Sequence, residues 1–427
     1  MQNCEMKKLW IINHSAIPPE LGGLNRHYYF SKYLSQMGYD VKIITSSAIH
    51  NTDTNIIGRQ EKAVLKDQKF GDVVYTFLKT RGYQGNGFTR IINFIQFPYR
   101  LLRHYRKLGK PDVIYASSPS PFAAFAAVRL AGKLRVPVMV EVRDLWPQTL
   151  VAYGGYSPKN PVIRLMYRME KWMYKRADRL IFTFEGGADY IRDKRWDCDI
   201  DMSKIRHINN GVDIEEYREN LSAVLEDAEL DDPSVFKIVY TGSIRKAYRL
   251  GNLLDSAKII AQTHPDIRFL LWGDGNEKAA LMERCRTEHI GNVSFKGRIE
   301  RRMVPSVLAR ADVNLLHVNP MGDEVLACYG CSPNKLFDYL ASGRPTVSNI
   351  RPGYDLIKAR GCGVVAEGAS PKDLAEAILA VYDMPKEQYE NVCANALNTA
   401  AEYDYRLLAQ KLGSVIEEAV REKACRR

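Results

Sequence analysis

Long apolar segments are missing from this sequence. The longest candidate, around residues 123–128, ends at Arg129 and falls far short of the ~20 apolar residues that a membrane-spanning helix needs. Near the N-terminus, Lys7 and Lys8 precede only the apolar run 9–12, which is too short for the core of a secretory signal and is typical of a strand. We therefore expect a cytoplasmic protein without a membrane span.

Cysteine is also sparse. Eight cysteines are scattered over 427 residues, a pattern typical of reduced thiols in an intracellular protein. The only close pair, Cys328 and Cys331, forms a CxxC motif, but a zinc ribbon requires a second pair and the sequence has none. A metal or redox role is therefore disfavoured.

Several catalytic and nucleic-acid-binding motifs are absent as well. The chain contains no Ser-His-Asp order, HExxH, Walker A or kinase set, and no carboxylate cluster that resembles a metal site. Helix-turn-helix, zinc-finger and RNP-like signatures are also missing. We expect no cofactor, no metal ion and no nucleic-acid partner.

Charge is abundant but unevenly distributed. Residues 1–213 hold 33 Lys and Arg against 19 Asp and Glu, a net +14, whereas residues 214–427 hold 28 against 31, a net −3, which together give the formal +11. A basic half joined to a mildly acidic half predicts different partners for the two halves. An anionic membrane surface or a phosphorylated acceptor suits the basic half.

Strand-like and helix-like segments alternate along the chain, which predicts an α/β protein with parallel, doubly wound sheets. The predicted strands are 9–13, 41–45, 73–78, 113–116, 138–142 and 180–184, then 236–240, 267–272, 293–295, 313–318, 346–348 and 363–366. The acid-rich segment 214–235 has no strand pattern. We predict two Rossmann-like domains facing a central cleft, 1–213 and 236–404, with 214–235 as a connector and 405–427 packed back on the first domain.

Two loops of the first half follow predicted strands. Gly22 and Gly23 precede the helical pattern 24–37, where they permit close backbone approach and offer N–H groups to an anion; a plain tight turn is the alternative. Arg143 and Asp144 follow the buried strand 138–142, where charges are costly unless they are paired or used. A structural ion pair is the alternative there.

Two stretches of the second half suit a phosphorylated ligand. Arg245 and Lys246 follow a strand beside a glycine, as a diphosphate site requires, although a solvated basic loop has the same pattern. The stretch 331–345 predicts a short helix with Ser332 as N-cap. Lys335 and Asp338 share one face of it, which suits a ligand with phosphate and hydroxyl groups; a capped surface helix with one ion pair is the alternative.

An amphipathic helical pattern covers residues 88–110 and mixes aromatic and basic residues. One face carries Ile91, Ile95, Tyr99, Leu102 and Tyr105, and other positions carry Arg100, Arg103, Arg106 and Lys107. Such a helix suits the interface of an anionic membrane. A core-packed helix with a solvated basic face is the alternative.

Taken in order, these motifs resemble the retaining GT-B glycosyltransferases of family four. The resemblance rests on PPELGGLNRH, RDLWP, NNGVD, YTGSIRKA, WGDG and SPNKLFDYLASGRP. RDLWP combined with KLFDYLASGRP is similar to the WbuB-type N-acetyl-L-fucosaminyltransferase branch of bacterial O-antigen and capsule assembly. The resemblance implies a GT-B fold and retaining, metal-independent transfer from a nucleotide sugar, with UDP expected, to a polyprenyl-diphosphate-linked or other glycan acceptor at the inner face of the plasma membrane.

The resemblance also implies roles for individual residues. The donor site would comprise Gly22, Gly23, Arg245, Lys246, Arg298, Ser332, Asn334, Lys335 and Asp338. Within this set, Arg245 and Lys246 would hold the diphosphate, Arg298 would meet the nucleobase, and Asp338 would bind the ribose. Arg143 and Asp144 occupy the catalytic-loop position, with Asp144 orienting the acceptor or stabilising an oxocarbenium ion.

This sequence departs from the family pattern at three positions. Arg143 stands where histidine is common, Asp338 is one methylene shorter than the usual glutamate, and Gly330 replaces another glutamate. Glu324 or Tyr329 is a candidate substitute for the latter. Two other functions are alternatives: a GT-B nucleotide-sugar 2-epimerase, which would require several carboxylates and a histidine around the sugar, and an inactive nucleotide-sugar-binding subunit.

Overall fold

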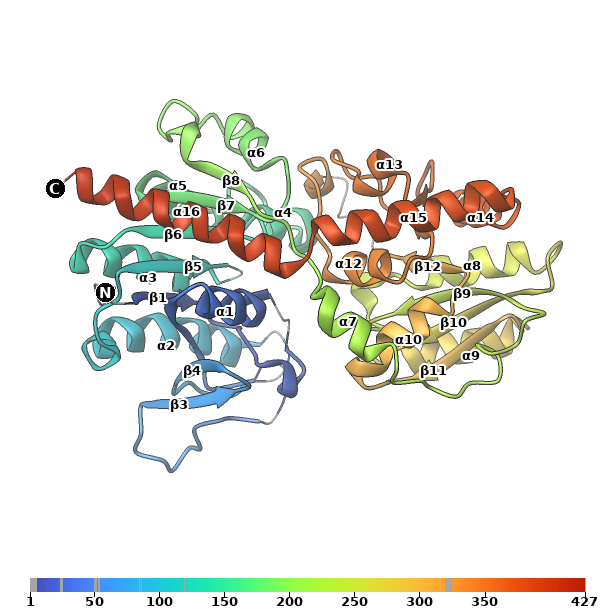
Figure 1. Ribbon diagram of the computed structural model, residues 1–427, viewed down its shortest axis with the longest axis horizontal. Helices are drawn as coiled ribbons and strands as arrows, with labels where there is room; N and C mark the ends of the chain where they lie inside the picture. Colours follow the sequence, from blue (N-terminus) through green and yellow to red (C-terminus); the bar gives the residue numbers. More distant parts are fainter. Residues whose placement is uncertain are drawn as a thin grey trace. The chain divides into compact units, whose positions relative to one another are not determined.

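The computed structural model describes residues 6–23, 26–49, 52, 54–83, 85, 87–118, 120–318 and 325–426. The chain forms two compact α/β units, one made of residues 1–209 and 405–427 and the other of residues 210–404 (Figure 1). Each unit contains its own largely parallel sheet with helices packed on it. No helix in the described ranges has the length and apolarity to cross a membrane.

The sheet of the first unit has the strand order β3-β4-β2-β1-β5-β6-β7-β8. Its strands are β1 (Lys7–Ile12), β2 (Tyr39–Ser46), β3 (Leu65–Phe70), β4 (Val73–Leu78), β5 (Val113–Ser117), β6 (Val138–Val142), β7 (Arg179–Phe182) and β8 (Ile205–His207). All neighbours pair in parallel except β3, which pairs antiparallel with β4. The two edge strands, β3 and β8, were not predicted, because β3 is mostly exposed and polar and β8 has only three residues.

The helices of the first unit cover both faces of this sheet (Figure 1). They are α1 (Arg26–Gln36), α2 (Phe88–His104), α3 (Pro121–Leu134), α4 (Gln148–Gly154), α5 (Pro161–Arg176), α6 (Gly187–Asp193) and α16 (Tyr405–Cys425). Short 3-10 turns occur at Pro19–Leu21, Tyr105–Leu108 and Met202–Lys204. The helix expected over residues 88–110 therefore ends as α2 at His104 and continues as a 3-10 turn.

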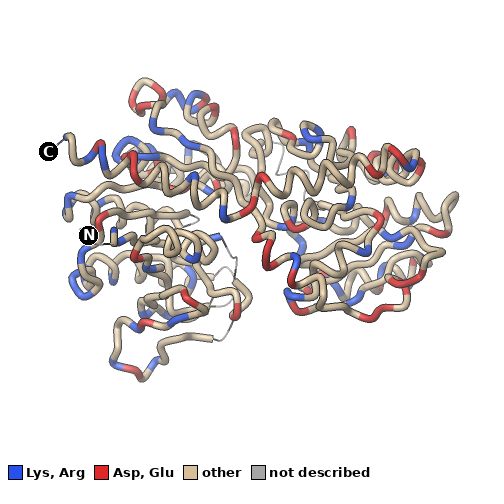
Figure 2. The backbone as a smooth tube through the Cα atoms, viewed as in Figure 1, with Lys and Arg blue, Asp and Glu red and all other residues tan. Residues whose placement is uncertain are grey.

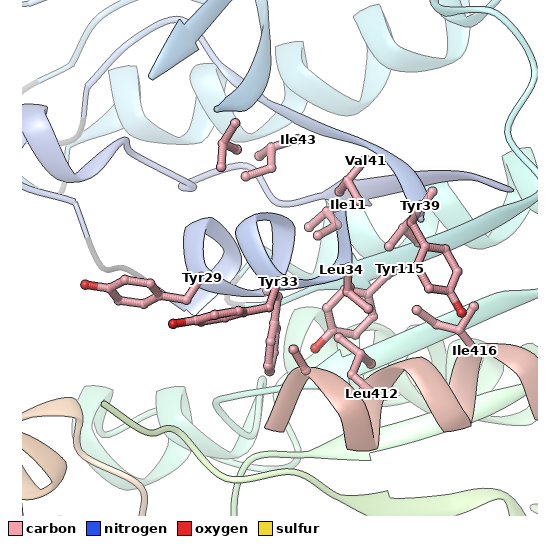
Figure 3. Close-up of a cluster of buried hydrophobic side chains, with 14 of the residues drawn as sticks. Ile11, Tyr29, Tyr33, Leu34, Tyr39, Val41, Ile43, Tyr115, Leu412 and Ile416 are labelled. Atoms are coloured by element: carbon pink, nitrogen blue, oxygen red, sulfur yellow. The ribbon is translucent and has the colours of Figure 1, made fainter. Parts of the chain in front are cut away.

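The C-terminal helix α16 packs against α1 in the first unit. Leu34 of α1 and Leu412 and Ile416 of α16 belong to one buried cluster with side chains of the central strands (Figure 3). The rings of Tyr29 and Tyr405 stack with centroids 4.9 Å apart. Residues from both ends of the sequence thus build the core of the first unit.

The second unit has a parallel sheet of order β11-β10-β9-β12-β13-β14. Its strands are β9 (Phe236–Thr241), β10 (Ile267–Trp272), β11 (Val293–Gly297), β12 (Val313–Leu316), β13 (Thr346–Ser348) and β14 (Gly363–Val365). Alternate residues of β9 enter different apolar clusters, Ile238 and Tyr240 in one and Val239 in the other, so both faces of the sheet are covered.

The helices around this sheet form the two apolar clusters. They are α7 (Ile214–Asn220), α8 (Gly251–Ile260), α9 (Lys278–Thr287), α10 (Val304–Ala309), α12 (Asn334–Ala341), α13 (Leu356–Arg360), α14 (Pro371–Tyr382) and α15 (Lys386–Glu402), with 3-10 turns at Lys246–Tyr248 and Arg301–Met303. The segment 214–235, expected to be a connector, contains α7 and belongs to the second unit. Its Asp227 pairs with Lys296 of β11 at 2.7 Å.

The division into units sharpens the charge asymmetry (Figure 2). Residues 1–209 and 405–427 together hold 39 Lys and Arg against 21 Asp and Glu, a net +18. Residues 210–404 hold 22 against 29, a net −7, and the two values sum to +11. The return of α16 to the first unit and the packing of the acidic segment 214–235 in the second account for the difference from the sequence halves.

Candidate functional site

Three loops of the second unit lie side by side at the carboxyl ends of β9, β10 and β11. The N–H of Gly242 donates to the carbonyl of Trp272 at 2.9 Å, and the N–H of Gly273 donates to the carbonyl of Gly297 at 2.8 Å. A Cβ at Gly273 would lie only 1.8 Å from the carbonyl oxygen of Gly242, so this close approach requires glycine. In open parallel sheets, ligands bind at this edge.

Lys335 of α12 is a half-buried cation beside these loops. Its Nζ lies 4.4 Å from the ring centroid of Tyr240 and 5.0 Å from that of Tyr248. A Cβ at Gly242 would be 2.9 Å from the same Nζ. Burial lowers the pKa of Lys335 to about 8, and no carboxylate within the described ranges forms an ion pair with it. A desolvated cation without a counter-ion is costly in an empty protein and suits an anionic ligand.

His317 adds a buried polar group that the sequence analysis did not single out. Its Nδ1 lies 3.0 Å from the carbonyl oxygen of Tyr248, and its Nε2 has no hydrogen-bond partner among the described residues. Burial, together with the charge of Lys335, lowers the pKa of His317 to about 4. The imidazole is therefore neutral at pH 7 and can offer one nitrogen to a ligand. The sequence feature that could have identified His317 is a histidine inside the apolar strand pattern 313–318.

Asp338 lies one turn after Lys335 on α12 and is 19% exposed. Its carboxylate pairs with Arg301 at 3.6 Å, not with Lys335. Burial raises the pKa of Asp338, and the charge of Arg301 opposes this rise. The hydroxyl of Tyr339 fixes the helix to the end of β9, because it accepts from the N–H of Thr241 at 3.2 Å. The helix thus presents a cation and a carboxylate that do not neutralise each other.

The predicted N-cap at Ser332 is wrong. The helix begins at Asn334 and Pro333 occupies the N-cap position without a side-chain hydrogen bond. The Oγ of Ser332 instead accepts from the N–H of Asn210 at 3.0 Å, while the Asn210 side chain donates to the Ser332 carbonyl at 2.6 Å. These two hydrogen bonds connect Asn210 of the NNGVD turn to the residue two positions before α12.

Asn334, the first residue of α12, is half-buried, whereas the three remaining predicted donor cations of this unit are solvent-exposed. Arg245 and Lys246 follow Gly242 and begin a 3-10 turn, and Arg298 follows β11. The N–H of Ile244 donates to the carbonyl of Asp274 at 2.9 Å, which holds the loop that carries Arg245 against the loop after β10. Both arginines and Lys246 therefore belong to neighbouring loops of one sheet edge.

The position of the missing family glutamate has a distinctive backbone. Gly330 has a φ of +96°, a value that side-chain-bearing residues rarely adopt. A glutamate at this position would therefore strain the loop. Of the two candidate substitutes, Tyr329 is half-buried next to this glycine, whereas Glu324 lies outside the described residues.

In the first unit, the predicted glycine loop is a closed 3-10 turn. The N–H of Gly22 donates to the carbonyl of Pro19 at 2.8 Å, and the N–H of Gly23 donates to the carbonyl of Pro18 at 3.1 Å. The expectation that these N–H groups are free for an anion is wrong, because the turn already uses them. The structure instead shows the tight turn that the sequence analysis gave as the alternative.

Glu141 of β6, also in the first unit, is a buried carboxylate surrounded by donors. It accepts from Arg26 Nε at 2.5 Å and lies 3.0 Å from His27 Nε2, and Tyr115 and Ser117 also donate to it. Burial acts to raise the pKa of Glu141, but the charges of Arg26 and His27 outweigh it and hold this pKa well below its usual range. Sequence reasoning missed this group, although a glutamate inside VMVEV was a visible irregularity.

This buried group positions the ends of several elements. Arg26 opens α1 and also donates to the carbonyls of Ile208 and Asn209, at 2.8 and 2.5 Å. Glu141 lies two residues before Arg143, whose N–H donates to Ser118 Oγ at 2.9 Å. The network therefore fixes the start of α1, the end of β8 and the loop after β6 relative to one another within the first unit.

Arg143 and Asp144 lie at the carboxyl end of β6, as predicted. Arg143 is half-buried and Asp144 is exposed. No ion pair joins the two side chains in the described structure, which disfavours a purely structural pair. Asp144 is thus available to a ligand at the edge of the first sheet. In the described ranges, no group of three or more His, Cys, Asp or Glu side chains could hold a metal ion.

Comparisons with known proteins agree with this architecture. Residues 21–216 match the family model described as Glycosyltransferase Family 4, and residues 235–384 match the model described as Glycosyl transferases group 1. No curated protein matches the sequence.

Solved structures show the same fold at low sequence identity. Sucrose-phosphate synthase from Thermosynechococcus elongatus has a TM-score of 0.70 at 15% identity, covering 96% of this chain and 98% of that one. A trehalose-6-phosphate structure from E. coli with bound UDP-2-fluoro glucose has a TM-score of 0.70 at 12% identity, covering 96% and 99%. HepE from Anabaena, in complex with UDP and glucose, has a TM-score of 0.63 at 15% identity, covering 96% and 99%.

The two family matches together cover most of the chain; the first lies mainly in the first α/β unit and the second lies within the second unit. The chain is therefore a glycosyltransferase of the GT-B fold.

Proposed function

We propose that the protein transfers a sugar from a UDP-sugar, with retention of anomeric configuration, to a lipid-linked glycan acceptor. The observation that carries the donor half of this proposal is the half-buried Lys335 beside Gly242, which has no carboxylate counter-ion within the described ranges. A diphosphate next to this ammonium group would supply the missing counter-charge. The structures of HepE and of the E. coli relative contain UDP or a UDP-sugar, which supports uracil as the nucleobase.

The other donor contacts follow from the same sheet edge. Arg245 and Lys246, on the loop after β9, bind the second phosphate, and Arg298, after β11, binds the nucleobase. Asp338 holds the ribose hydroxyl groups, with Ser332 and Asn334 at the start of the helix.

The chemistry is one glycosyl transfer. The bond between the anomeric carbon and the phosphate oxygen breaks, and a bond from the same carbon to the acceptor oxygen forms on the same face of the sugar. The departing diphosphate takes the proton of the acceptor hydroxyl, and Lys335, Arg245 and Lys246 stabilise its charge. Asp144 orients the acceptor or stabilises the oxocarbenium ion, with Arg143 beside it. Because these cations neutralise the leaving group, the reaction requires no metal ion.

The donor sugar and the pathway are the finer part of the proposal. Gly330 supplies no carboxylate for the sugar hydroxyls, which suits a sugar with fewer of them, such as N-acetyl-L-fucosamine. The net +18 of the first unit supports an anionic acceptor at the inner face of the plasma membrane. We assign the enzyme to O-antigen, capsule or exopolysaccharide assembly.

A thermal-shift panel of UDP-, GDP- and dTDP-sugars tests the donor. A ligand that binds only the folded state raises the Tm, by the equivalent of about 2.7 kcal/mol at a hundredfold excess over Kd. We expect a shift with UDP-sugars that is lost in Lys335→Met and kept in Lys372→Met, an exposed lysine of α14. A UDP-sugar shift in Lys335→Met equal to that of the wild type would overturn the assignment.

Turnover separates the proposal from its alternatives. A transferase should slowly release UDP from its donor in the absence of acceptor, whereas an inactive binding subunit should release none. A 2-epimerase should convert one UDP-sugar into its C2 epimer, which is visible by NMR. Formation of the epimer would contradict the transferase assignment.

A further inference from the structure

Helix α2 exposes a row of large apolar side chains, here called the α2 row. It consists of Phe88, Ile91, Ile95, Tyr99 and Leu102, which are 75, 52, 55, 59 and 38% exposed. Their spacing of three or four residues places them along one stripe of the helix, while Asn93, Phe97 and Leu101 on the other side are buried. A contiguous exposed apolar surface of this kind marks an interaction site.

A basic recess lies at the same helix, on its polar side. The recess has a volume of about 330 Å³, and Arg59, Lys79, Arg81 and Arg100 provide its cationic lining. Arg100 comes from α2 itself, and Lys79 and Arg81 follow β4. No acidic side chain lines it among the residues that the structure describes. The recess therefore suits an anion.

The four cations divide into two that build the wall and two that face outward. Lys79 Nζ donates to the carbonyl of Arg59 at 2.9 Å, and Arg100 donates to the carbonyl of Lys79. The guanidinium groups of Arg59 and Arg81 are exposed, and neither donates to an acceptor in the described part of the chain. Two neighbouring guanidinium groups can each bind a phosphate in bidentate fashion.

The recess lies at the ligand-binding edge of the first sheet. Thr80, in its wall, is 2.7 Å from Ser46 at the end of β2, joined through their hydroxyl groups. Asn93 of α2 links His14, which follows β1, to the carbonyl of Arg81, with contacts of 2.5 and 2.6 Å. The carboxyl ends of β1, β2 and β4 thus support the recess, and the loop that carries Asp144 extends from the same edge.

We propose that the basic recess binds the diphosphate of a polyprenyl-diphosphate-linked acceptor while the α2 row enters the surface of the bilayer. A lipid diphosphate lies at headgroup depth, directly beside hydrocarbon, and the protein pairs a basic recess with an apolar row on one helix. Charge complementarity favours this occupant, because the recess is cationic and the acceptor carries a diphosphate. The inference rests on the proposed function and specifies where its acceptor binds.

Flotation with vesicles tests this inference on the full-length protein. One set contains phosphatidylcholine with undecaprenyl diphosphate, and a second contains phosphatidylcholine with enough phosphatidylglycerol to match the surface charge. We expect the wild type to prefer the diphosphate vesicles by about tenfold. Arg59→Gln combined with Arg81→Gln should remove the preference, whereas the control pair Lys69→Gln and Lys159→Gln should keep it.

Further arms separate the lipid from a free anion. Ile91→Ser combined with Ile95→Ser should weaken binding to both vesicle types, and soluble inorganic diphosphate should compete poorly with the lipid. A preference retained in the double arginine variant, or soluble diphosphate competing as well as the lipid, would overturn the inference. A UDP-sugar thermal shift, measured in parallel, should persist in every variant. If the protein prefers the diphosphate vesicles but shows no thermal shift with UDP-sugars, the donor assignment is wrong and the assignment of the recess still holds.

Discussion

At the residue scale, burial of Lys335 makes donor affinity depend on pH. Because the pKa of Lys335 is lowered to about 8, the ammonium group loses its proton as pH rises through this value and no longer attracts a diphosphate. We expect the Kd for UDP to increase between about pH 7 and 9. Lys335→Arg keeps its positive charge over this range, so its Kd for UDP should change less with pH. Any change that remains in this variant measures the effect of uracil ionisation. Equal profiles for the two proteins would contradict the role of Lys335.

The lowered pKa of Lys335 also predicts that the ligand-free protein becomes more stable as pH rises, whereas its affinity for UDP falls. In the unfolded chain the lysine keeps its ordinary pKa, so between about pH 8 and 10.5 the unfolded state binds a proton that the native state does not. The free energy of unfolding of the ligand-free protein therefore receives a contribution from Lys335 that rises with pH across this window. Urea denaturation of wild type and Lys335→Met should differ in this slope. A parallel pH dependence would show that the lysine is not desolvated.

Glu141 is the residue whose replacement should cost most stability. Glu141→Gln keeps the shape but leaves the buried guanidinium of Arg26 uncompensated, and breaking such a pair costs about 3–5 kcal/mol. Arg26→Met combined with Glu141→Met removes both charges and should be less destabilised than Arg26→Met and Glu141→Met predict together. Urea denaturation of the wild type, these two single variants and the double variant gives the coupling energy. Additive effects would mean that the pair contributes no coupling.

Single residues also show where sequence reasoning ends. Lys335, Asp338, Arg143 and Asp144 were found because each stands next to a strand end or a helix start, and the structure places them there. Glu141 and Arg26 are 115 positions apart, and no local pattern relates them. The Ser332 cap failed for a similar reason, since the competing Asn210 is distant in sequence.

At the element scale, α16 should contribute to the stability of the first unit although it follows the second unit in sequence. Leu412→Ala opens a cavity in the core between α1 and α16 and should lower the free energy of unfolding by about 2–5 kcal/mol. Leu407 lies on the same helix but is 44% exposed, so Leu407→Ala is the matched control and should cost much less. Comparable losses in both variants would indicate an effect on helix propensity and not on packing.

Elements with an apolar period were predictable, and the others were not. Each predicted strand is present in the structure within a few residues, because buried parallel strands are nearly continuous apolar runs. The edge strand β3 has the sequence LKDQKF and gives no such signal. The amphipathic pattern of α2 was visible, but the sequence could not decide between a core-packed and an exposed apolar face. The exposure of Ile91 and Ile95 decides it for an exposed face.

At the scale of the whole molecule, the uneven charge separates two explanations for membrane binding. If the protein binds anionic vesicles through the surface around α2, then Arg103→Glu combined with Lys107→Glu should weaken binding to phosphatidylglycerol vesicles, since each basic residue near such a surface contributes about 1 kcal/mol. Lys372→Glu combined with Lys386→Glu changes the net charge by the same amount in the second unit and should leave binding unchanged. Both variants should keep the UDP-sugar thermal shift.

Vesicle binding by the Arg103→Glu/Lys107→Glu variant should also lose most of its salt dependence, because exposed charges are screened within about 10 Å at 0.1 M salt. If the two charge reversals weaken binding equally, net charge and not the basic surface of the first unit controls the interaction.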